Sequence, residues 1–347
     1  MKIGFYFGKT WGWADGDYEG RGMGGTEGTL VCMARELAKQ NEVYVYTPTS
    51  KPGKFHGVMY MHDSLLNTVE YFDVFVSLSR TPLLPDINSK VKVHWSNEDS
   101  ETWVESWAWT LPHVQAVFTI SPFHTEHLVQ NYKIPRELIF ETSCGIDAGK
   151  YKEKITKVKN QLIYCSVPNR GLSLLEHIFF IISSEIPDVS LVVTSDFTLW
   201  GHDDPGNAPY RELFVNNPRV HFLGKVPRDE LVYYQKTSVL HVYPCIVNEL
   251  CCIASLECQA SGTPTIATRR GALSSTVAHG YSGYLIDSNP FENPNFSQEF
   301  ADIVISLLKN PEKLNQLSNQ ARERALTEFD YAKLANDWMS KWKELSG

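Results

Sequence analysis

The chain contains no apolar run of the about 18 residues that a transmembrane helix needs. Its start also lacks the pattern of a secretion signal, because MKIGFYFGKTWGW has no sustained apolar segment after its basic residue. These absences predict a cytoplasmic protein with at most peripheral membrane contact.

Basic residues are fewer than acidic ones, 32 against 40, which gives a net charge of −8. An extended nucleic-acid surface is therefore not expected, since such surfaces neutralise phosphates with lysine and arginine. A length of 347 residues with 43% hydrophobic residues predicts two globular domains, each with its own core.

The chain has no C-x-x-C pair, and its cysteines form an odd, irregularly spaced set of seven. This pattern indicates reduced thiols rather than a disulfide framework. Adjacent Cys251 and Cys252, followed by Cys258, also lack the spacing of a zinc motif, so no metal site is predicted.

Two nucleotide-binding motifs are missing from the first strand and the loop after it. An NAD-binding domain needs G-x-G-x-x-G there and an acidic residue ending the second strand, whereas this chain has YFGKTWGW and VYVYTPTS. The GKT at Gly8 to Thr10 is not a P-loop, because Ile3 occupies the position of the first glycine.

Strand-like and helix-like segments alternate along the chain, which predicts parallel, doubly wound α/β sheets. In the first half we expect strands at Lys2–Phe7, Glu42–Pro48, Phe72–Ser79, Lys90–Trp95 and His113–Ser121, and helices at Gly25–Gln40 and from Pro122. After a lysine-rich connection the pattern restarts, with strands at Leu162–Val167, Val189–Ser195, Arg219–Gly224, Ser238–Cys245 and Thr263–Thr268, and helices at Leu172–Ser184, Arg228–Lys236 and Cys252–Ser261. The sequence thus predicts two Rossmann-like domains facing a cleft, divided at residues 150/151.

The segment NELCCIASLECQASG carries Glu249 in a loop and Glu257 in the helix that follows. The loop lies at the carboxyl end of a predicted parallel strand, where such sheets bind ligands. The free N–H groups and the dipole at the start of the helix favour a phosphate. Two carboxylates beside an anion site are best explained as acceptors for hydroxyl groups. Together these features predict a nucleotide sugar, which joins ribose hydroxyls, a diphosphate and sugar hydroxyls.

Four short motifs, in order along nearly the whole chain, resemble those of the retaining glycosyltransferases of the GT-B fold, family 4. NELCCIASLECQASGTPTIAT is similar to the family's E-x7-E segment, and CSVPNRGLSLLE (Cys165 to Glu176) to its diphosphate-binding turn. GGTEG (Gly24 to Gly28) resembles the N-terminal glycine loop, and CGIDAGKY (Cys144 to Tyr151) the element before the hinge.

The resemblance implies that residues 1–150 bind the acceptor, that 151–325 bind the nucleotide sugar, and that the helix in 326–347 packs back on the first domain. It implies that Glu257 binds the ribose and that Arg170 contacts the diphosphate. It also implies that Glu249 binds the transferred sugar together with the backbone N–H groups of Leu250, Cys251 and Cys252. The donor is further expected to approach Gly24 and Gly25. The implied co-substrate is a UDP- or GDP-linked sugar, with no metal and no other cofactor.

The chain departs from the family pattern at three places. Ser166 stands where many members have a second basic residue, so Lys225 is a candidate substitute. The active-site histidine of the family corresponds either to His94 or, in another alignment, to Asn97. Ser275 replaces a common acidic residue.

The loop Gly8–Met23 is long and aperiodic, which is typical of functional or disordered loops. Trp11, Trp13 and Tyr18 are candidates for stacking on an acceptor sugar, or alternatively for pinning the loop to its domain. The same loop holds DGD (Asp15 to Asp17), which has the spacing of the metal-binding Asp-x-Asp of the other glycosyltransferase fold, although its place after the first strand disfavours that role.

The sequence therefore predicts a retaining, metal-independent hexosyltransferase that moves a sugar from a nucleotide-diphosphate sugar to a hydroxyl acceptor. The alternative is a non-catalytic subunit of the same fold that binds a nucleotide sugar in a regulatory or scaffolding role. The motifs leave the base, the sugar and the acceptor open.

Overall fold

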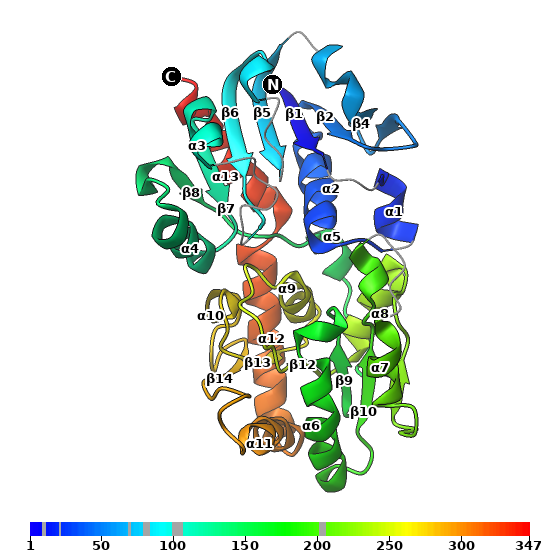
Figure 1. The fold of residues 1–347 in the computed structure, drawn as a ribbon. Helices are drawn as coiled ribbons and strands as arrows, with labels where there is room; N and C mark the ends of the chain where they lie inside the picture. The colour runs from blue at the N-terminus through cyan, green and yellow to red at the C-terminus, as the bar shows by residue number, and fades with distance from the viewer. Residues whose placement is uncertain (9–11, 21, 69–70, 79–83, 99–106, 201–205) are drawn as a thin grey trace. The chain divides into compact units, whose positions relative to one another are not determined.

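The computed structural model describes residues 1–8, 12–20, 22–68, 71–78, 84–98, 107–200 and 206–347. The chain divides into two compact units, which are drawn in Figure 1. The N-terminal unit comprises Met1–Tyr18, Gly25–Gly145 and Tyr331–Gly347, and the C-terminal unit comprises Glu19–Gly24 and Ile146–Asp330.

The N-terminal unit is built on an eight-stranded sheet in the order β3-β4-β2-β1-β5-β6-β7-β8. All neighbouring strands are parallel except β3 and β4. Its strands are β1 (Lys2–Phe7), β2 (Glu42–Thr47), β3 (Gly53–Phe55), β4 (Val58–His62), β5 (Phe72–Leu78), β6 (Ser89–Trp95), β7 (Ala116–Thr119) and β8 (Ile139–Glu141). Its helices are α1 (Asp15–Gly20), α2 (Gly25–Leu37), α3 (Trp107–Thr110), α4 (Pro122–Tyr132) and α13 (Tyr331–Leu345), although the last residues of α1 group with the other unit.

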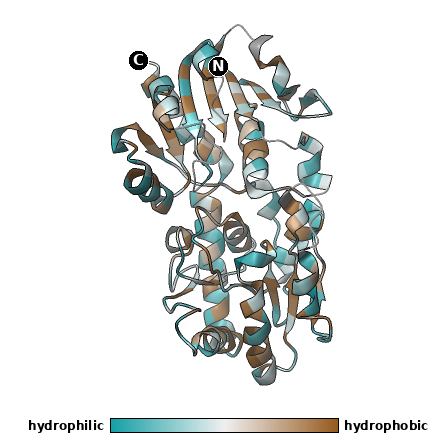
Figure 2. Ribbon diagram, in the orientation of Figure 1, coloured by the Kyte–Doolittle hydropathy of each residue, from teal (hydrophilic) through white to brown (hydrophobic). Residues whose placement is uncertain are grey.

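The central strands of this sheet are buried along almost their whole length, as parallel strands covered on both faces must be. Figure 2 shows hydrophobic residues along these strands. Helix α13 packs against α2, and its Trp338 ring lies edge-on to Trp95, with the ring centroids 4.6 Å apart. The Trp338 indole also donates a hydrogen bond to Thr142 Oγ1 (3.0 Å), so the last helix of the chain completes the core of the first unit.

The C-terminal unit has a six-stranded, wholly parallel sheet in the order β11-β10-β9-β12-β13-β14. Its strands are β9 (Gln161–Tyr164), β10 (Ser190–Val193), β11 (Val220–Phe222), β12 (Leu240–Tyr243), β13 (Thr265–Thr268) and β14 (Gly283–Ile286). Its helices are α5 (Ala148–Tyr151), α6 (Leu172–Glu185), α7 (Asn207–Glu212), α8 (Arg228–Thr237), α9 (Ile253–Ala260), α10 (Leu273–Thr276), α11 (Phe296–Leu308) and α12 (Pro311–Glu328). Helix α11 packs on α6, and α12 packs on α9.

The predicted α/β class with two parallel sheets is confirmed, and each predicted strand and helix is present within a few residues of its predicted bounds. The units differ in detail from the predicted segments, because the chain passes into the C-terminal unit at residue 146 and returns at 331. The prediction of an aperiodic loop over Gly8–Met23 missed the short helix α1 within it. The strands β3, β4, β8 and β14 were also not predicted. Among the described residues, no helix is long and apolar enough to span a bilayer.

Candidate functional site

Two of the predicted donor residues, Arg170 and Glu249, lie in the connections that follow β9 and β12. These strands are neighbours, with Leu240 and His241 paired to Leu162 and Ile163. The short 3-10 turn Pro168–Arg170 follows β9 and leads into α6, while the loop that carries Glu249 follows β12 and leads into α9. The backbone N–H of Ile246 donates to the carbonyl of Arg170 (3.3 Å), which ties the two connections together.

Gly171, at the start of α6, has a positive φ of 125°. A Cβ atom there would collide with the carbonyl oxygen of Pro244 in the loop after β12. Glycine is therefore required both by the backbone conformation and by the close approach of the two loops. The turn brings the N-terminus of α6, with its free N–H groups, to the same sheet edge as Arg170.

The side chain of Glu249 is oriented by a buried tyrosine. Oε1 of Glu249 accepts a hydrogen bond from the hydroxyl of Tyr243, which also lies 3.3 Å from Ser166 Oγ. The pKa of Tyr243 is raised well above its usual value, first by burial and then by the negative charge of Glu249. Tyr243 thus stays a hydrogen-bond donor and fixes the direction of the carboxylate.

Arg170 lies in the electrostatic field of the same carboxylate. Burial lowers the pKa of Arg170, but Glu249, followed by Tyr243, more than offsets this, so the net shift is upward. Arg170 and Glu249 are each half-buried. A permanent cation and an oriented carboxylate therefore stand together at this edge.

The loop of Glu249 is held by its backbone as well. Glu249 forms a parallel bridge with Gly271, and its carbonyl accepts from the N–H of Ala272 (2.7 Å). Gly271 has a φ of 54°, and a Cβ there would overlap the backbone of Glu249. Leu250 to Cys252 follow in this loop, and α9 begins at Ile253, one residue later than predicted.

Glu257 lies in the second turn of α9 with only 6% of its surface exposed. One carboxylate oxygen pairs with the guanidinium of Arg228, and the other accepts from Nε2 of Gln235 (3.0 Å). Tyr151 links these partners, since it donates to Gln235 Oε1 (3.0 Å) and accepts from Arg228 Nη2 (3.1 Å).

The partners of Glu257 were missed by the sequence interpretation. Arg228 is the first residue of α8, where the helix dipole disfavours a cation. A basic residue at the first position of a helix is therefore the feature of the sequence that could have indicated a buried acidic partner.

The other donor candidates lie in separate elements of the chain. Lys225 follows β11, and its ammonium donates to the carbonyl of Thr198 (3.3 Å). Gly25 is the first residue of α2 in the N-terminal unit, directly after Gly24. Ser275, in α10, donates its hydroxyl proton to the carbonyl of Ala272 (2.9 Å).

In the N-terminal unit, His94 is fully buried near the end of β6. Its Nδ1 lies 3.0 Å from Ser77 Oγ, and its ring packs edge-on against Trp107 at 5.4 Å. Burial, with a smaller contribution from His124, lowers the pKa of His94 to about 3. Asn97 is half-buried just beyond the strand and donates to the carbonyl of Trp95 (3.3 Å). The structure gives His94 the environment of a core histidine, and the choice between these two for the family position stays a prediction.

Two of the acceptor candidates are buried inside the N-terminal unit. Trp13 is 4% exposed and packs edge-on against Phe7 and Tyr60. Tyr18 is 6% exposed and lies under the guanidinium of Arg35 at 5.3 Å. Their positions favour the alternative role of pinning the loop. Trp11 lies outside the described residues.

Asp15, the first acid of the DGD sequence, is also structural. It is 1% exposed and accepts hydrogen bonds from Arg35, with Nη2 at 2.7 Å, and from the hydroxyl of Tyr60 at 3.0 Å. His56 Nδ1 lies 2.7 Å away. Since both carboxylate oxygens are engaged, the arrangement disfavours the Asp-x-Asp metal role.

Comparison with known proteins finds a family model that matches most of the C-terminal unit. Residues 168–324 match the model of "Glycosyl transferases group 1". D-inositol 3-phosphate glycosyltransferase of Corynebacterium efficiens is 32% identical over 149 residues, which are 42% of this chain and 33% of that protein. The chain thus spans about a third of the length of this curated relative.

Solved structures resemble the whole chain. Sucrose-phosphate synthase from Thermosynechococcus elongatus superposes with a TM-score of 0.75 at 16% identity, covering 99% of both chains. HepE of Anabaena, solved in complex with UDP-glucose, gives a TM-score of 0.72 at 16% identity and covers 99% of this chain and 100% of that one. These likenesses confirm the GT-B fold.

Proposed function

We propose that this chain, whose residues 168–324 match the model of the glycosyl transferases group 1, is a retaining, metal-independent glycosyltransferase of family 4. It moves a hexose from a UDP- or GDP-linked sugar to a hydroxyl acceptor. The observation that carries the proposal is the meeting of Arg170 and Glu249 at the carboxyl ends of β9 and β12.

The chemistry of transfer requires stabilisation of the leaving group. As the bond between the sugar and the diphosphate breaks, negative charge grows on the diphosphate, and preorganised positive groups lower the barrier. Arg170 supplies a fixed charge, and the N-termini of α6 and α9 supply N–H groups at the same edge. A divalent ion is not needed for that role when a cation and helix dipoles fill it.

The two glutamates take different parts. Glu249, oriented by Tyr243, accepts hydrogen bonds from hydroxyls of the transferred sugar. Glu257 binds the ribose through the lone pairs that Arg228 and Gln235 leave free, since a carboxylate offers about four acceptor sites. The structural likeness to HepE, which was solved with UDP-glucose, supports UDP as the nucleotide.

The second candidate is a non-catalytic subunit that binds a nucleotide sugar. Ser166 in place of a second cation, together with the fully buried His94, favours this alternative. The presence of both Arg170 and Glu249 favours transfer, because a regulatory binder does not need a residue that hydrogen-bonds to the transferred sugar.

The test is a thermal-shift panel with UDP, GDP, ADP and their sugars, with and without EDTA. A ligand that binds only the folded state raises the melting temperature, so one nucleotide sugar is expected to stand out. For each ligand, the melting temperature is compared between samples with and without ligand at the same EDTA concentration. Any effect of EDTA on the ligand-free protein then cancels. A shift that EDTA abolishes and that added Mg²⁺ or Mn²⁺ restores would contradict metal independence, and no shift with any nucleotide would contradict both candidates.

One variant then tests the role of Glu257. Glu257→Gln should weaken nucleotide binding and leave turnover at saturating donor close to the unmodified protein. Donor hydrolysis or transfer in the presence of a hydroxyl acceptor separates the enzyme from the binder. A protein that binds the sugar nucleotide tightly and never releases the free sugar or a glycoside would favour the binder.

A further inference from the structure

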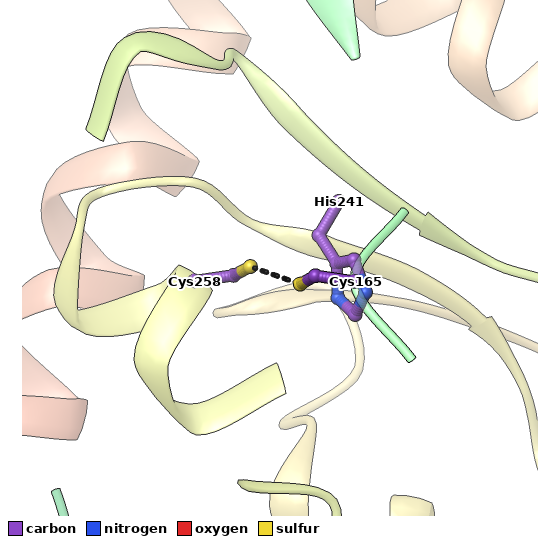
Figure 3. A group of neighbouring side chains, drawn as sticks. All are labelled: Cys165, His241 and Cys258. Atoms are coloured by element: carbon purple, nitrogen blue, oxygen red, sulfur yellow. Dashed lines mark hydrogen bonds between the residues drawn. The ribbon is translucent and has the colours of Figure 1, made fainter. Parts of the chain in front are cut away.

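Three buried side chains from three elements of the C-terminal unit converge in its interior. Cys165 follows β9, His241 lies on β12 and Cys258 lies on α9. Figure 3 shows the two cysteines pointing toward one another, with the imidazole of His241 beside Cys165. The two sulfur atoms are 3.6 Å apart, and one ligand atom from each residue lies within 4.8 Å of the others. Cys258 and His241 are fully buried, and Cys165 is 8% exposed.

The imidazole of His241 is incompletely satisfied. Its Nδ1 lies 3.2 Å from Thr265 Oγ1, whereas Nε2 is buried and makes no well-formed hydrogen bond among the described residues, although the imidazole interacts with the thiol of Cys165. A buried polar nitrogen without a partner costs about 1–3 kcal/mol, so a native protein is expected to supply one.

We propose that Cys165, His241 and Cys258 bind one Zn²⁺ ion, which joins β9, β12 and α9. Two thiolates and one neutral imidazole form a ligand set that zinc prefers, and they balance the charge of the ion in a buried site. At a Zn–S distance of about 2.3 Å, tetrahedral geometry sets the sulfurs about 3.8 Å apart, close to the 3.6 Å observed. A water molecule takes the fourth position.

The surroundings of His241 suit a metal ligand. Thr265 Oγ1, which engages Nδ1, itself receives a hydrogen bond from Ser255 (2.9 Å), and Ser255 receives one from Gln259 (3.0 Å). Such a chain fixes the orientation of the ring, as the outer-shell partners of metal-bound histidines do. Nε2 is then free to bind the ion.

The two thiols are unequal before an ion binds. A hydrogen bond from Cys258 lowers the pKa of Cys165, while burial, followed by that same hydrogen bond, raises the pKa of Cys258. Binding of zinc requires both sulfur atoms to lose their protons. We expect the affinity for zinc to fall as the pH falls, because protons compete for the sulfur atoms.

The site goes beyond the proposed function and does not depend on it. Its sulfur and nitrogen ligands differ from the oxygen ligands of an ion that would bridge a diphosphate. Cys165 immediately precedes the turn that carries Ser166 and Arg170, and Cys258 follows Glu257. The ion would therefore brace the edge at which the donor residues lie.

A disulfide between Cys165 and Cys258 is the competing arrangement. It would require the sulfurs to approach from 3.6 Å to about 2.05 Å and a two-electron oxidant such as hydrogen peroxide. It would also leave Nε2 of His241 without a partner. The zinc site accounts for all three side chains.

The test measures metal in the full-length protein, purified without chelators. Elemental analysis should give close to one zinc per chain. Cobalt added to the metal-free protein should produce thiolate-to-cobalt charge-transfer absorption together with the intense visible bands of a tetrahedral ion. Cys258→Ala and His241→Gln should each lower the affinity for cobalt at least tenfold. Cys32→Ala, which alters a buried helical cysteine of the other unit, should retain both signals.

Each other outcome overturns the proposal. Unmodified protein that holds no zinc and gives no cobalt charge-transfer band would do so without any variant. Equal cobalt affinity in Cys258→Ala and the unmodified protein would place the ion elsewhere. A mass lower by two hydrogens, with a bond between Cys165 and Cys258 found by peptide mapping of the freshly purified protein, would establish the disulfide.

Discussion

The C-terminal unit and the N-terminal unit differ in where they place the residues predicted to act. In the C-terminal unit Arg170 and Glu249 are half-buried at the ends of two paired strands. In the N-terminal unit Trp13 and His94 are buried in the core. The donor motif has fixed local spacing and follows from the geometry of a strand, loop and helix. An acceptor site depends on loops, whose aromatic residues can equally serve packing.

The largest effect expected from this contrast is on stability. Trp13→Ala should destabilise the N-terminal unit by about 3–5 kcal/mol, because it removes a large buried side chain packed against Phe7 and Tyr60. Chemical denaturation followed by tryptophan fluorescence measures the loss. Trp109→Ala is the matched control, since Trp109 is 46% exposed, and it should cost within about 0.5 kcal/mol. If the Trp13→Ala protein has normal stability but a raised KM for the acceptor, Trp13 would be an acceptor-binding residue after all.

The next effect is on turnover. Glu249→Gln should lower kcat about 10²–10³-fold, comparable to the loss of one preorganised group at a transition state. Binding of the nucleoside diphosphate alone, measured by calorimetry, should be almost unchanged. Glu176→Gln, an exposed glutamate of α6, is the control for charge. If Glu249→Gln instead weakens nucleotide binding at constant kcat, the assignment of the two glutamates is wrong.

A third effect is the pH dependence of stability. Because burial lowers the pKa of His94 to about 3, the unfolded chain binds a proton below its usual pKa of 6.5 while the folded unit does not. Acidification below that pH therefore costs stability, by up to about 1.4 kcal/mol per pH unit for one such histidine. His94→Gln should flatten the fall in unfolding free energy between about pH 6 and 4, where His124 continues to contribute.

Urea denaturation at several pH values measures this slope. An identical slope in His94→Gln would show that His94 does protonate in the folded protein. If the activity changes with pH as His94 gains or loses its proton, the result would support a catalytic role of His94 rather than a role in packing alone.

The smallest expected effect is on the affinity of the proposed donor site for a nucleoside diphosphate. Ser166→Arg restores the second cation common in the family and should tighten binding of a nucleoside diphosphate by roughly fivefold, about 1 kcal/mol for a half-exposed charge. Ser184→Arg, at an exposed position on α6, should leave the affinity unchanged. No gain from Ser166→Arg would indicate that another cation, such as Lys225, already fills the role.

The sequence predicted the fold well because strand runs and amphipathic helices are local patterns. Lys2–Phe7 was predicted as a strand and is β1, and Leu172–Ser184 was predicted as a helix and is α6 with one further residue. The strands β8 and β14, with 3 and 4 residues, were missed, although strands as short as these, such as β11 and β9, were predicted. Segments of this length are shorter than the window that periodicity needs, so a pattern search finds some of them and misses others.

The partners of the site were less predictable, since they come from distant parts of the chain. Arg228 lies 29 residues before Glu257, and no local pattern joins them. Cys165 and Cys258 are 93 residues apart, so a search for paired cysteines at short spacing could not find them. Parallel sheets bring together the ends of strands that are distant in sequence, which spacing rules do not describe.

The return of the chain to its first unit at Tyr331 has a consequence for synthesis on the ribosome. Trp338 and Trp342 belong to the core around Trp95, yet they are made only after residues 146–330. Translation of residues 146–330 takes roughly 10–40 s at ~5–20 residues per second, and the N-terminal unit lacks its final helix throughout. The N-terminal unit is thus completed only after residues 146–330 have been made, and during that interval the face around Trp95 is open to chaperones or to misassembly.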